Sequence, residues 1–139
     1  MNNFEFGEEL KKRTKKFAIK VISFTKKLTK SSENIVFINQ IIRAASAVAS
    51  NYRAACRGRS KAEFYSKLSI VIEETDETQF WLEMIEEFNP GLKNEITEIY
   101  KEGEDLMKIF AKSRKTMNLS KYSQTHKLTN SQTHKLINS

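Results

Sequence analysis

Apolar residues recur through most of the chain at steps of three, four and seven, the spacing of one buried face of an α-helix. Between Glu8 and Lys30 this pattern lasts about six turns and predicts a first helix. Ser31-Ser32 interrupts it, and Ser32 is a suitable N-cap for a second helix. The two predicted buried faces are Leu10, Thr14, Phe17, Val21, Phe24 and Leu28, followed by Ile35, Ile38, Ile41, Ala45, Val48, Tyr52 and Ala55.

A third helix is predicted from about Ser60 to Phe88. Ser60 and Glu63 have the spacing of a capping box, and Gly58 is suited to the left-handed conformation that closes the second helix. Asn89-Pro90-Gly91 ends the third helix and allows a fourth to begin at once. The predicted seams are Phe64, Leu68, Val71, Thr75, Thr78, Leu82 and Ile85, then Leu92, Ile96, Ile99, Gly103, Leu106, Phe110, Ser113 and Met117.

These elements predict an all-α fold, an antiparallel up-down-up-down four-helix bundle over residues 1–119. Four Gly and one Pro among 139 residues are too few for the many tight turns of a β-sandwich. Residues 120–139 form a polar tail with a tandem octapeptide, Ser123 to Asn130 and Ser131 to Asn138, which has no acidic residue. We expect this tail to be disordered, because it offers too little apolar surface to bury.

The chain has a single cysteine, Cys56, no secretory signal pattern at its start and no apolar run long enough to span a membrane. These features predict a soluble cytoplasmic protein without a membrane partner. The net charge of +7 is unevenly distributed. Residues 11–67 contain fifteen Lys and Arg against two Glu, while residues 73–105 contain twelve acidic residues against two Lys. A bundle divided in this way can orient on a polyanion or on another copy of itself.

The residues offer little for catalysis, and we expect neither enzyme activity nor a cofactor. No histidine precedes His126, which rules out the inward Glu-x-x-His pairs of carboxylate-metal bundles, and His126 with His134 alone makes a poor metal site. The acidic cluster from Glu73 to Glu77 is best interpreted as a hydrated helix face. Cys56 lies among arginines that can lower a thiol pKa, yet without a histidine base we interpret it as a small apolar residue.

Four basic residues surround Gly58 in the turn between the second and third helices: Arg53, Arg57, Arg59 and Lys61. Together with a helix N-terminus they predict contact with the phosphate backbone of RNA or DNA, reinforced by the first-helix residues Lys12, Lys16 and Lys20. Two alternatives stay open. The arginines could pair with carboxylates of the third or fourth helix, within one chain or between copies, and Glu63 could itself occupy the helix end.

A second set of residues lies outside the main seams and predicts self-association. Trp81, Met84 and Phe88 follow steps of three and four on the third helix, and Ile22 plays a similar part on the first. They would leave apolar surface exposed on a monomer, which favours a homo-oligomer. The alternative is that they widen the core of a monomer.

Several of these residues also carry a family resemblance. Gln40 to Ser46, Asn51, Arg59 to Phe64 and Trp81 to Glu83 together resemble the bacterial four-helix-bundle proteins known as 23S rRNA intervening-sequence proteins, over about residues 8–117. The resemblance implies a pentameric ring and a likeness to the accessory variability protein of diversity-generating retroelements, a basic barrel that binds nucleic acid. This chain departs from many members, which have Glu-Gly where it has Ala54 and Ala55.

The leading functional hypothesis is therefore a non-catalytic, oligomeric bundle that binds nucleic-acid backbones through the turn from Arg53 to Lys61 and through the first helix. The alternative is a scaffold for protein–protein interaction that recognises an acidic partner through the same surface, without nucleic acid.

Overall fold

The computed structural model confirms the all-α four-helix bundle. It describes the backbone of residues 1–132 and the side chains of residues 1–116, and this part of the chain contains no β-strand. The helices are α1 (Asn3–Thr25), α2 (Ser32–Cys56), α3 (Lys61–Phe88) and α4 (Lys93–Gln132), with a short 3₁₀ turn, η1 (Pro90–Leu92), before α4. Within residues 1–132, no helix is both apolar and long enough to cross a lipid bilayer.

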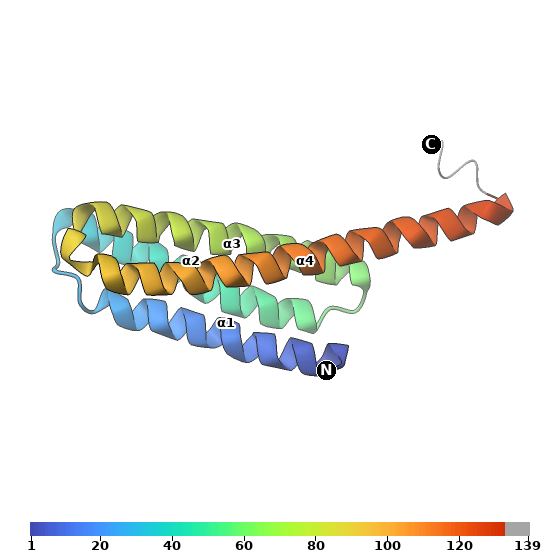
Figure 1. Cartoon of the computed structure of the whole chain (residues 1–139), viewed down its shortest axis with the longest axis horizontal. Coiled ribbons are helices and arrows are strands. Elements are labelled where there is room, and N and C mark those ends of the chain that lie inside the picture. The colour runs from blue at the N-terminus through green and yellow to red at the C-terminus, as the bar shows by residue number, and fades with distance from the viewer. Residues whose placement is uncertain (133–139) are drawn as a thin grey trace.

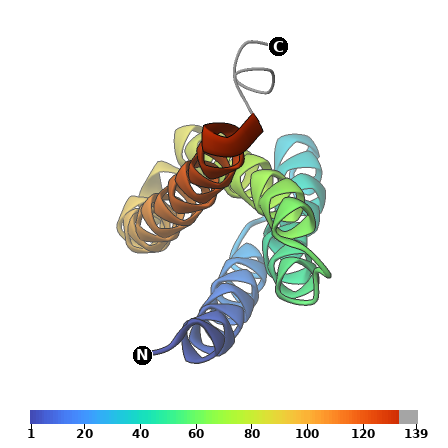
Figure 2. The ribbon, with the colours of Figure 1, turned by 90° about the vertical axis from the view of Figure 1, so that its right-hand side faces the viewer.

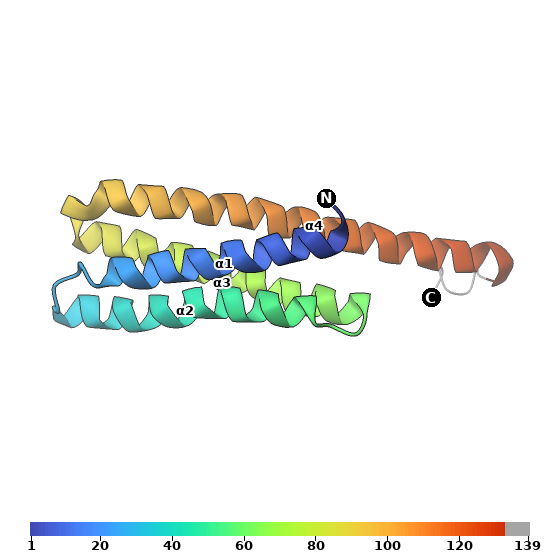
Figure 3. The same ribbon diagram turned by 90° about the horizontal axis from the view of Figure 1, so that it is seen from below.

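Successive helices run antiparallel and lie side by side (Figures 1 and 3). The α2–α3 pair makes the closest packing, α1–α2 and α3–α4 follow, and α1 touches α4 least of all. Figure 2, which faces the end where the N-terminus lies, shows α1 and α4 as the separated arms of the bundle. The N-terminus and the α2–α3 turn share this end, whereas the α1–α2 and α3–α4 turns form the opposite end (Figure 1).

The core consists largely of the predicted seams. On α1, α3 and α4 nearly every predicted seam residue with a described side chain is buried, and Phe64, Leu92 and Ser113 are half-buried at the seam ends. On α2 the predicted face is wrong in the first turn, where Ile35 is exposed and Asn34 and Phe37 are buried instead. The buried amide of Asn34 has polar partners, described below, that a hydrophobic pattern does not reveal.

The helix ends differ from prediction at two points. Ser31 rather than Ser32 is the N-cap of α2, with its hydroxyl accepting a hydrogen bond from the Asn34 backbone N–H. The predicted capping box at Ser60 and Glu63 is confirmed. Gly58 does not adopt the predicted left-handed conformation, because no glycine in the described residues has a positive φ. A Cβ at Gly58 would instead approach the Ala55 carbonyl oxygen at 3.1 Å, so glycine permits a close turn.

A pair of side-chain amides ties the two turns at one end of the bundle. Asn34 donates to Asn89 Oδ1 at 3.1 Å, and Asn89 donates to Asn34 Oδ1 at 2.9 Å. Asn34 Nδ2 also donates to the Thr29 carbonyl, and Asn89 Nδ2 to the Ile85 carbonyl. Because buried amides are costly unless their donors and acceptors are satisfied, this reciprocal pair fixes the α1–α2 turn against the end of α3.

The predicted tail differs from the structure in its first part. α4 continues as a helix to Gln132, well past the bundle (Figure 1), instead of ending near Leu119. No Gly or Pro follows Gly103, so nothing in the sequence interrupts the helix. Residues 133–139 lie outside the described part of the chain, so the disorder predicted for them stays a prediction.

The close contact between α3 and α4 depends on a glycine. Gln79, buried on α3, donates from Nε2 to the Tyr100 backbone carbonyl of α4 at 2.8 Å. Gly103 lies one turn further along α4, and a Cβ at that position would overlap the side-chain amide of Gln79. The hydrogen bond between the helices therefore requires the absence of a side chain at Gly103.

We predict that Gly103→Ala lowers the free energy of unfolding by about 1 kcal/mol. Displacing the Gln79 amide leaves buried polar groups unpaired at a cost of ~1–3 kcal/mol, partly offset by the ~1 kcal/mol higher helix propensity of Ala. In a Gln79→Ala background the change in the free energy of unfolding should have the opposite sign, so that Gly103→Ala stabilises the protein. Urea denaturation of the wild type, the two single variants and the double variant measures the coupling energy between Gln79 and Gly103. Gly91→Ala is the control, because a Cβ there would meet no atom within 4 Å. Equal effects in both backgrounds would contradict this account.

Candidate nucleic-acid interface

The predicted basic turn is an exposed corner at the end of α2. Arg57 is the C-cap of α2, and its backbone N–H donates to the Ala54 carbonyl at 3.1 Å. Arg53, Arg57, Arg59 and Lys61 are all exposed. Within residues 1–116, none of the three arginines forms an ion pair with a carboxylate. Their guanidinium groups therefore project positive charge into solvent.

The N-terminus of α3, just after this turn, is already occupied. Glu63 Oε2 accepts a hydrogen bond from the Arg59 backbone N–H at 2.6 Å, and Ser60 Oγ accepts from the Glu63 N–H at 3.1 Å. The Glu63 carboxylate thus stands where a bound anion would use the helix dipole. Any phosphate contact at this corner depends on the side chains of the arginines.

A shallow hollow of about 270 Å³ lies beside the turn and adds one residue that the sequence interpretation missed. It is lined by Ala54, Arg57, Gly58, Glu63, Ser66 and Lys67. Lys67 is exposed and has no ion-pair partner within residues 1–116. Lys67 follows Glu63 by one helical turn, so the sequence already indicated that the two side chains lie side by side next to the basic turn.

The three first-helix lysines predicted to bind nucleic acid do not share one environment. Lys12 Nζ lies 3.9 Å from Oε1 of Glu9 on the same helix, and Lys20 Nζ lies 3.5 Å from Oε1 of Glu98 on α4. Lys16 is exposed, without an ion-pair partner in the described side chains. Gly7 lies against Cys56, since a Cβ there would be 3.6 Å from Sγ, so the first turns of α1 adjoin the basic turn.

Carboxylates of α4 neutralise several of the remaining basic residues on and just after α1. Arg13 donates from Nε and Nη2 to the two carboxylate oxygens of Glu102, each at 2.8 Å. This hydrogen bonding outweighs desolvation and raises the pKa of Arg13. Lys20 of α1 pairs with Glu98, and Lys27, in the turn after α1, has its Nζ 2.5 Å from Glu95 Oε2, so the row of ion pairs extends toward the opposite end. The charge division seen in the sequence is thus partly neutralised inside the chain.

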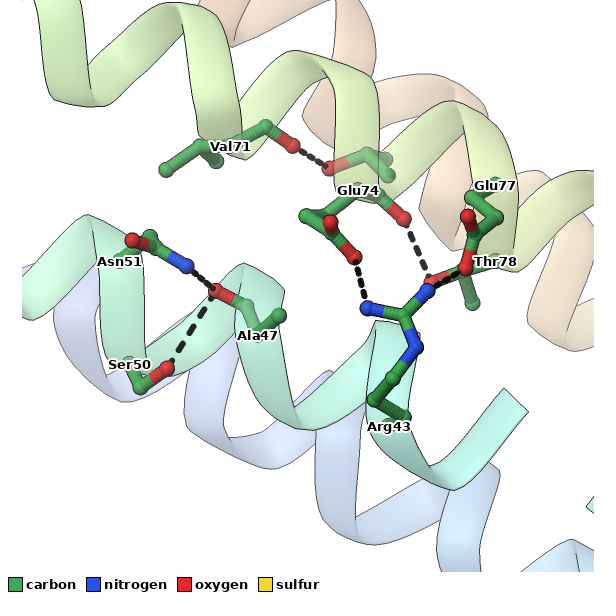
Figure 4. Close-up of polar contacts among 9 residues, drawn as sticks. Arg43, Ala47, Ser50, Asn51, Val71, Glu74, Glu77 and Thr78 are labelled. Atoms are coloured by element: carbon green, nitrogen blue, oxygen red, sulfur yellow. Dashed lines mark hydrogen bonds and ion pairs between the residues drawn. The ribbon is translucent and has the colours of Figure 1, made fainter. Parts of the chain in front are cut away.

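Arg43 plays a similar part between α2 and α3. Its Nη1 donates to Glu74 Oε2 at 3.2 Å, and its Nη2 pairs with Glu77 Oε2 (Figure 4). Two members of the predicted acidic cluster therefore bind an arginine of the neighbouring helix rather than facing water alone. Arg43 joins helices and is not available to a polyanion.

A second group of cations, not predicted as site residues, lies on α4 near the basic turn. Lys108, Lys112 and Lys115 are exposed at steps of four and three, which places them on one face of the helix. Arg114 is half-buried beside them. Within residues 1–116 none of these four forms an ion pair. The absence of acidic residues after Asp105 was the sequence signal for this basic face of α4.

The predicted self-association residues divide into two groups. Trp81, Met84 and Ile22 are half-buried, and Trp81 and Met84 pack against the core, which fits the alternative that they widen it. Phe88 is 53% exposed although its ring lies 5.2 Å from that of Phe37. Phe80, which was not predicted, is 48% exposed and stacks edge-on against Trp81. The exposed aromatic surface is therefore formed by Phe80 and Phe88.

Groups suited to metal binding or nucleophilic chemistry are scarce in this part of the chain. The described residues contain no group of three His, Cys, Asp or Glu placed to hold a metal ion, and His126 and His134 lie beyond the described side chains. Cys56 is half-buried and hydrogen-bonded to the buried Tyr52. Burial raises the pKa of the Cys56 thiol despite the lowering influence of Tyr52 and Lys11. The arginines nearby do not make it a thiolate.

Comparison with known proteins identifies the family to which this architecture corresponds. The family model described as 23S rRNA-intervening sequence protein matches residues 8–112. A crystal structure of a protein with unknown function from the S23 ribosomal protein family of Bacteroides thetaiotaomicron is similar, with 25% identity and a TM-score of 0.72. The similarity covers 78% of this chain and 97% of that one. No curated protein sequence matches.

We predict that Cys56 titrates above the range of a free thiol, because burial disfavours the thiolate. The rate of alkylation by iodoacetamide, measured against pH, should rise at higher pH in the folded protein than in protein unfolded in urea. Cys56 is the only cysteine, so the modified fraction reports on this residue alone. If the alkylation rate of the folded protein has its midpoint at a lower pH than that of the unfolded chain, the prediction is wrong and Cys56 becomes a candidate nucleophile.

Proposed function

Because this chain belongs to the 23S rRNA-intervening sequence protein family, we propose that it is a non-catalytic, self-associating bundle that binds the phosphate backbone of RNA or DNA. The binding surface is the basic turn (Arg53, Arg57, Arg59 and Lys61) together with the basic face of α4 (Lys108, Lys112 and Lys115). Such contacts provide affinity that depends on salt and carries little sequence selection.

The observation that carries this proposal is the contrast between paired and unpaired cations. Arg13, Lys20, Lys27 and Arg43 reach carboxylates of neighbouring helices. The three arginines of the basic turn have no such partner within residues 1–116. Arginine forks match phosphate oxygens well, and an exposed unpaired cluster attracts polyanions over distances near a Debye length.

The names of the similar proteins also favour RNA as the first partner to test. The family is described by an intervening sequence of 23S rRNA, and the solved relative is assigned to a ribosomal protein family. Exposed cations at the α2–α3 turn and on α4 supply the chemistry that an RNA backbone requires.

The non-catalytic part of the proposal rests on the chemistry that the side chains supply. No histidine precedes His126, so residues 1–125 lack the commonest general base. The Cys56 thiol is held protonated by burial, and the carboxylates of Glu74 and Glu77 are engaged by Arg43. These groups support packing and helix pairing.

Self-association is supported by the aromatic surface at the other end of the bundle. Phe80 and Phe88 are about half exposed, beside Trp81 and Phe37. Apolar rings exposed in this way are stabilised when a second copy covers them. Acidic residues flank them on α3, which suits a basic surface on the neighbouring copy.

We predict that Arg57→Glu/Arg59→Glu weakens binding of a labelled 20-nucleotide RNA by at least about tenfold at 100 mM salt. If both arginines contact phosphates, the magnitude of the slope of log affinity against log salt should fall by about 1.4 to 1.8, since each contact contributes roughly 0.7 to 0.9. Fluorescence anisotropy over a salt series measures both quantities. Lys26→Glu/Lys30→Glu is the matched control, because it makes the same charge change on exposed residues at the opposite end.

Two outcomes would contradict this proposal. Wild-type protein that fails to bind RNA or DNA at low salt, or that binds with an affinity independent of salt, is not a backbone-binding protein. Loss of oligomer assembly in Arg57→Glu/Arg59→Glu with unchanged nucleic-acid affinity would instead support the protein–protein scaffold, in which the basic turn recognises an acidic protein surface.

We predict that Phe80→Ser/Phe88→Ser reduces the sedimentation-equilibrium mass toward that of the 16.1 kDa monomer. The substitutions remove exposed rings and leave the buried seam intact, so the helical circular dichroism should be preserved. Phe4→Ser, which changes a ring that is 75% exposed at the other end, is the control and should retain the wild-type mass. A wild-type protein that is monomeric throughout the micromolar range would refute self-association.

A further inference from the structure

A hollow of about 440 Å³ lies between α1 and α4 and takes no part in the surface proposed above. We propose that it holds an unpaired base of a single-stranded nucleic acid whose phosphates lie on the neighbouring cations. This inference rests on the proposed function and specifies its ligand, a single strand rather than a duplex.

The lining of the hollow combines apolar and cationic side chains. It consists of Met1, Phe6, Glu9, Leu10, Lys12, Arg13, Lys16 and Ile109. Phe6, Leu10 and Ile109 supply apolar surface, of which Leu10 is buried in the core and Phe6 is 43% exposed. Lys16 has no carboxylate partner in the described side chains.

The carboxylate of Glu9 is the one acidic group in this lining, and it lies 3.9 Å from Lys12. Arg13 is neutralised by its two hydrogen bonds to Glu102. The hollow therefore retains positive charge at Lys16 and an apolar surface at Phe6, the pair of features that a nucleotide with one phosphate and one aromatic base requires.

The hollow is also the right size and in the right place. Its volume falls within the ~300–1,000 Å³ range typical of small-ligand sites, enough for a base and its sugar. It lies between α1 and α4, which pack against each other less than α1 packs against α2. The first turns of α1 adjoin Cys56 at the end of α2, so the hollow and the basic turn lie at the same end of the bundle. A strand that places one base in the hollow can continue toward the arginines.

The exposure of Phe6 and Phe4 favours a single strand. Phe4 is 75% exposed on the first turn of α1, close in sequence to Phe6. Exposed rings interspersed with cations form stacking platforms for bases, and every base has a face that can stack. A duplex keeps its bases stacked inside the helix and offers this surface only phosphates, so it cannot use the hollow without being unpaired.

The test compares a fluorescein-labelled 12-nucleotide oligouridylate with an RNA duplex of the same length by anisotropy. Phe6→Ala should weaken binding of the single strand by about tenfold and leave duplex binding unchanged. Ile35→Ala, at an apolar side chain of similar exposure at the opposite end and outside the aromatic surface of α3, is the matched control and should change neither affinity. Phe6→Trp should retain single-strand affinity, and its fluorescence should be quenched by oligouridylate but not by the duplex. Circular dichroism confirms that each variant is folded.

The outcomes separate this inference from the proposed function. If wild-type protein binds both nucleic acids and Phe6→Ala leaves single-strand affinity unchanged, the hollow does not hold a base, while the backbone-binding function stands. A change in sedimentation mass for Phe6→Ala without a change in single-strand affinity assigns the hollow to a second copy and overturns the inference. If wild-type protein binds neither nucleic acid, the inference and the proposed function both fail.

Discussion

The distribution of exposed charge on this bundle depends on how opposite charges are matched between neighbouring helices. Arg13 and Lys20 of α1, and Lys27 in the turn that follows it, pair with Glu102, Glu98 and Glu95 of α4, a helix against which α1 packs less than against α2. Exposed pairs of this kind contribute only ~0–1 kcal/mol each, so the apolar core supplies most of the stability. Their effect is on specificity: they align the two outer helices, whereas the arginines of the α2–α3 turn are among the exposed cations that have no carboxylate partner within residues 1–116.

Much of the fold was predictable because the buried positions repeat without interruption. The α3 seam from Leu68 to Ile85 alternates steps of four and three, and the threonines within it are buried with their hydroxyls bonded to carbonyls of their own helix. Capping chemistry is equally local, which is why Ser60 and Glu63 could be assigned from their spacing. Features that depend on residues within one turn of each other can be predicted from one sequence.

Features that depend on the register between helices could not be predicted in this way. Lys20 and Arg57 are both basic and exposed, yet within residues 1–116 only Lys20 meets a carboxylate, because the packing of α1 against α4 places Glu98 beside it. The same limitation explains the exchange of Ile35 for Phe37 in the core and the unexpected exposure of Phe80. The hollow at Phe6 and Ile109 joins residues a hundred positions apart and has no signature in the sequence.

The reciprocal amides of Asn34 and Asn89 mean that the two ends of α1 are held by different kinds of interaction. They bind the α1–α2 turn to the end of α3, so α1 is held there by the backbone and by buried hydrogen bonds. Toward its N-terminus α1 is held to α4 mainly through Arg13 and Glu102. Added salt should therefore screen the ion pair that attaches α1 to α4 and leave the buried amide pair at the other end unchanged.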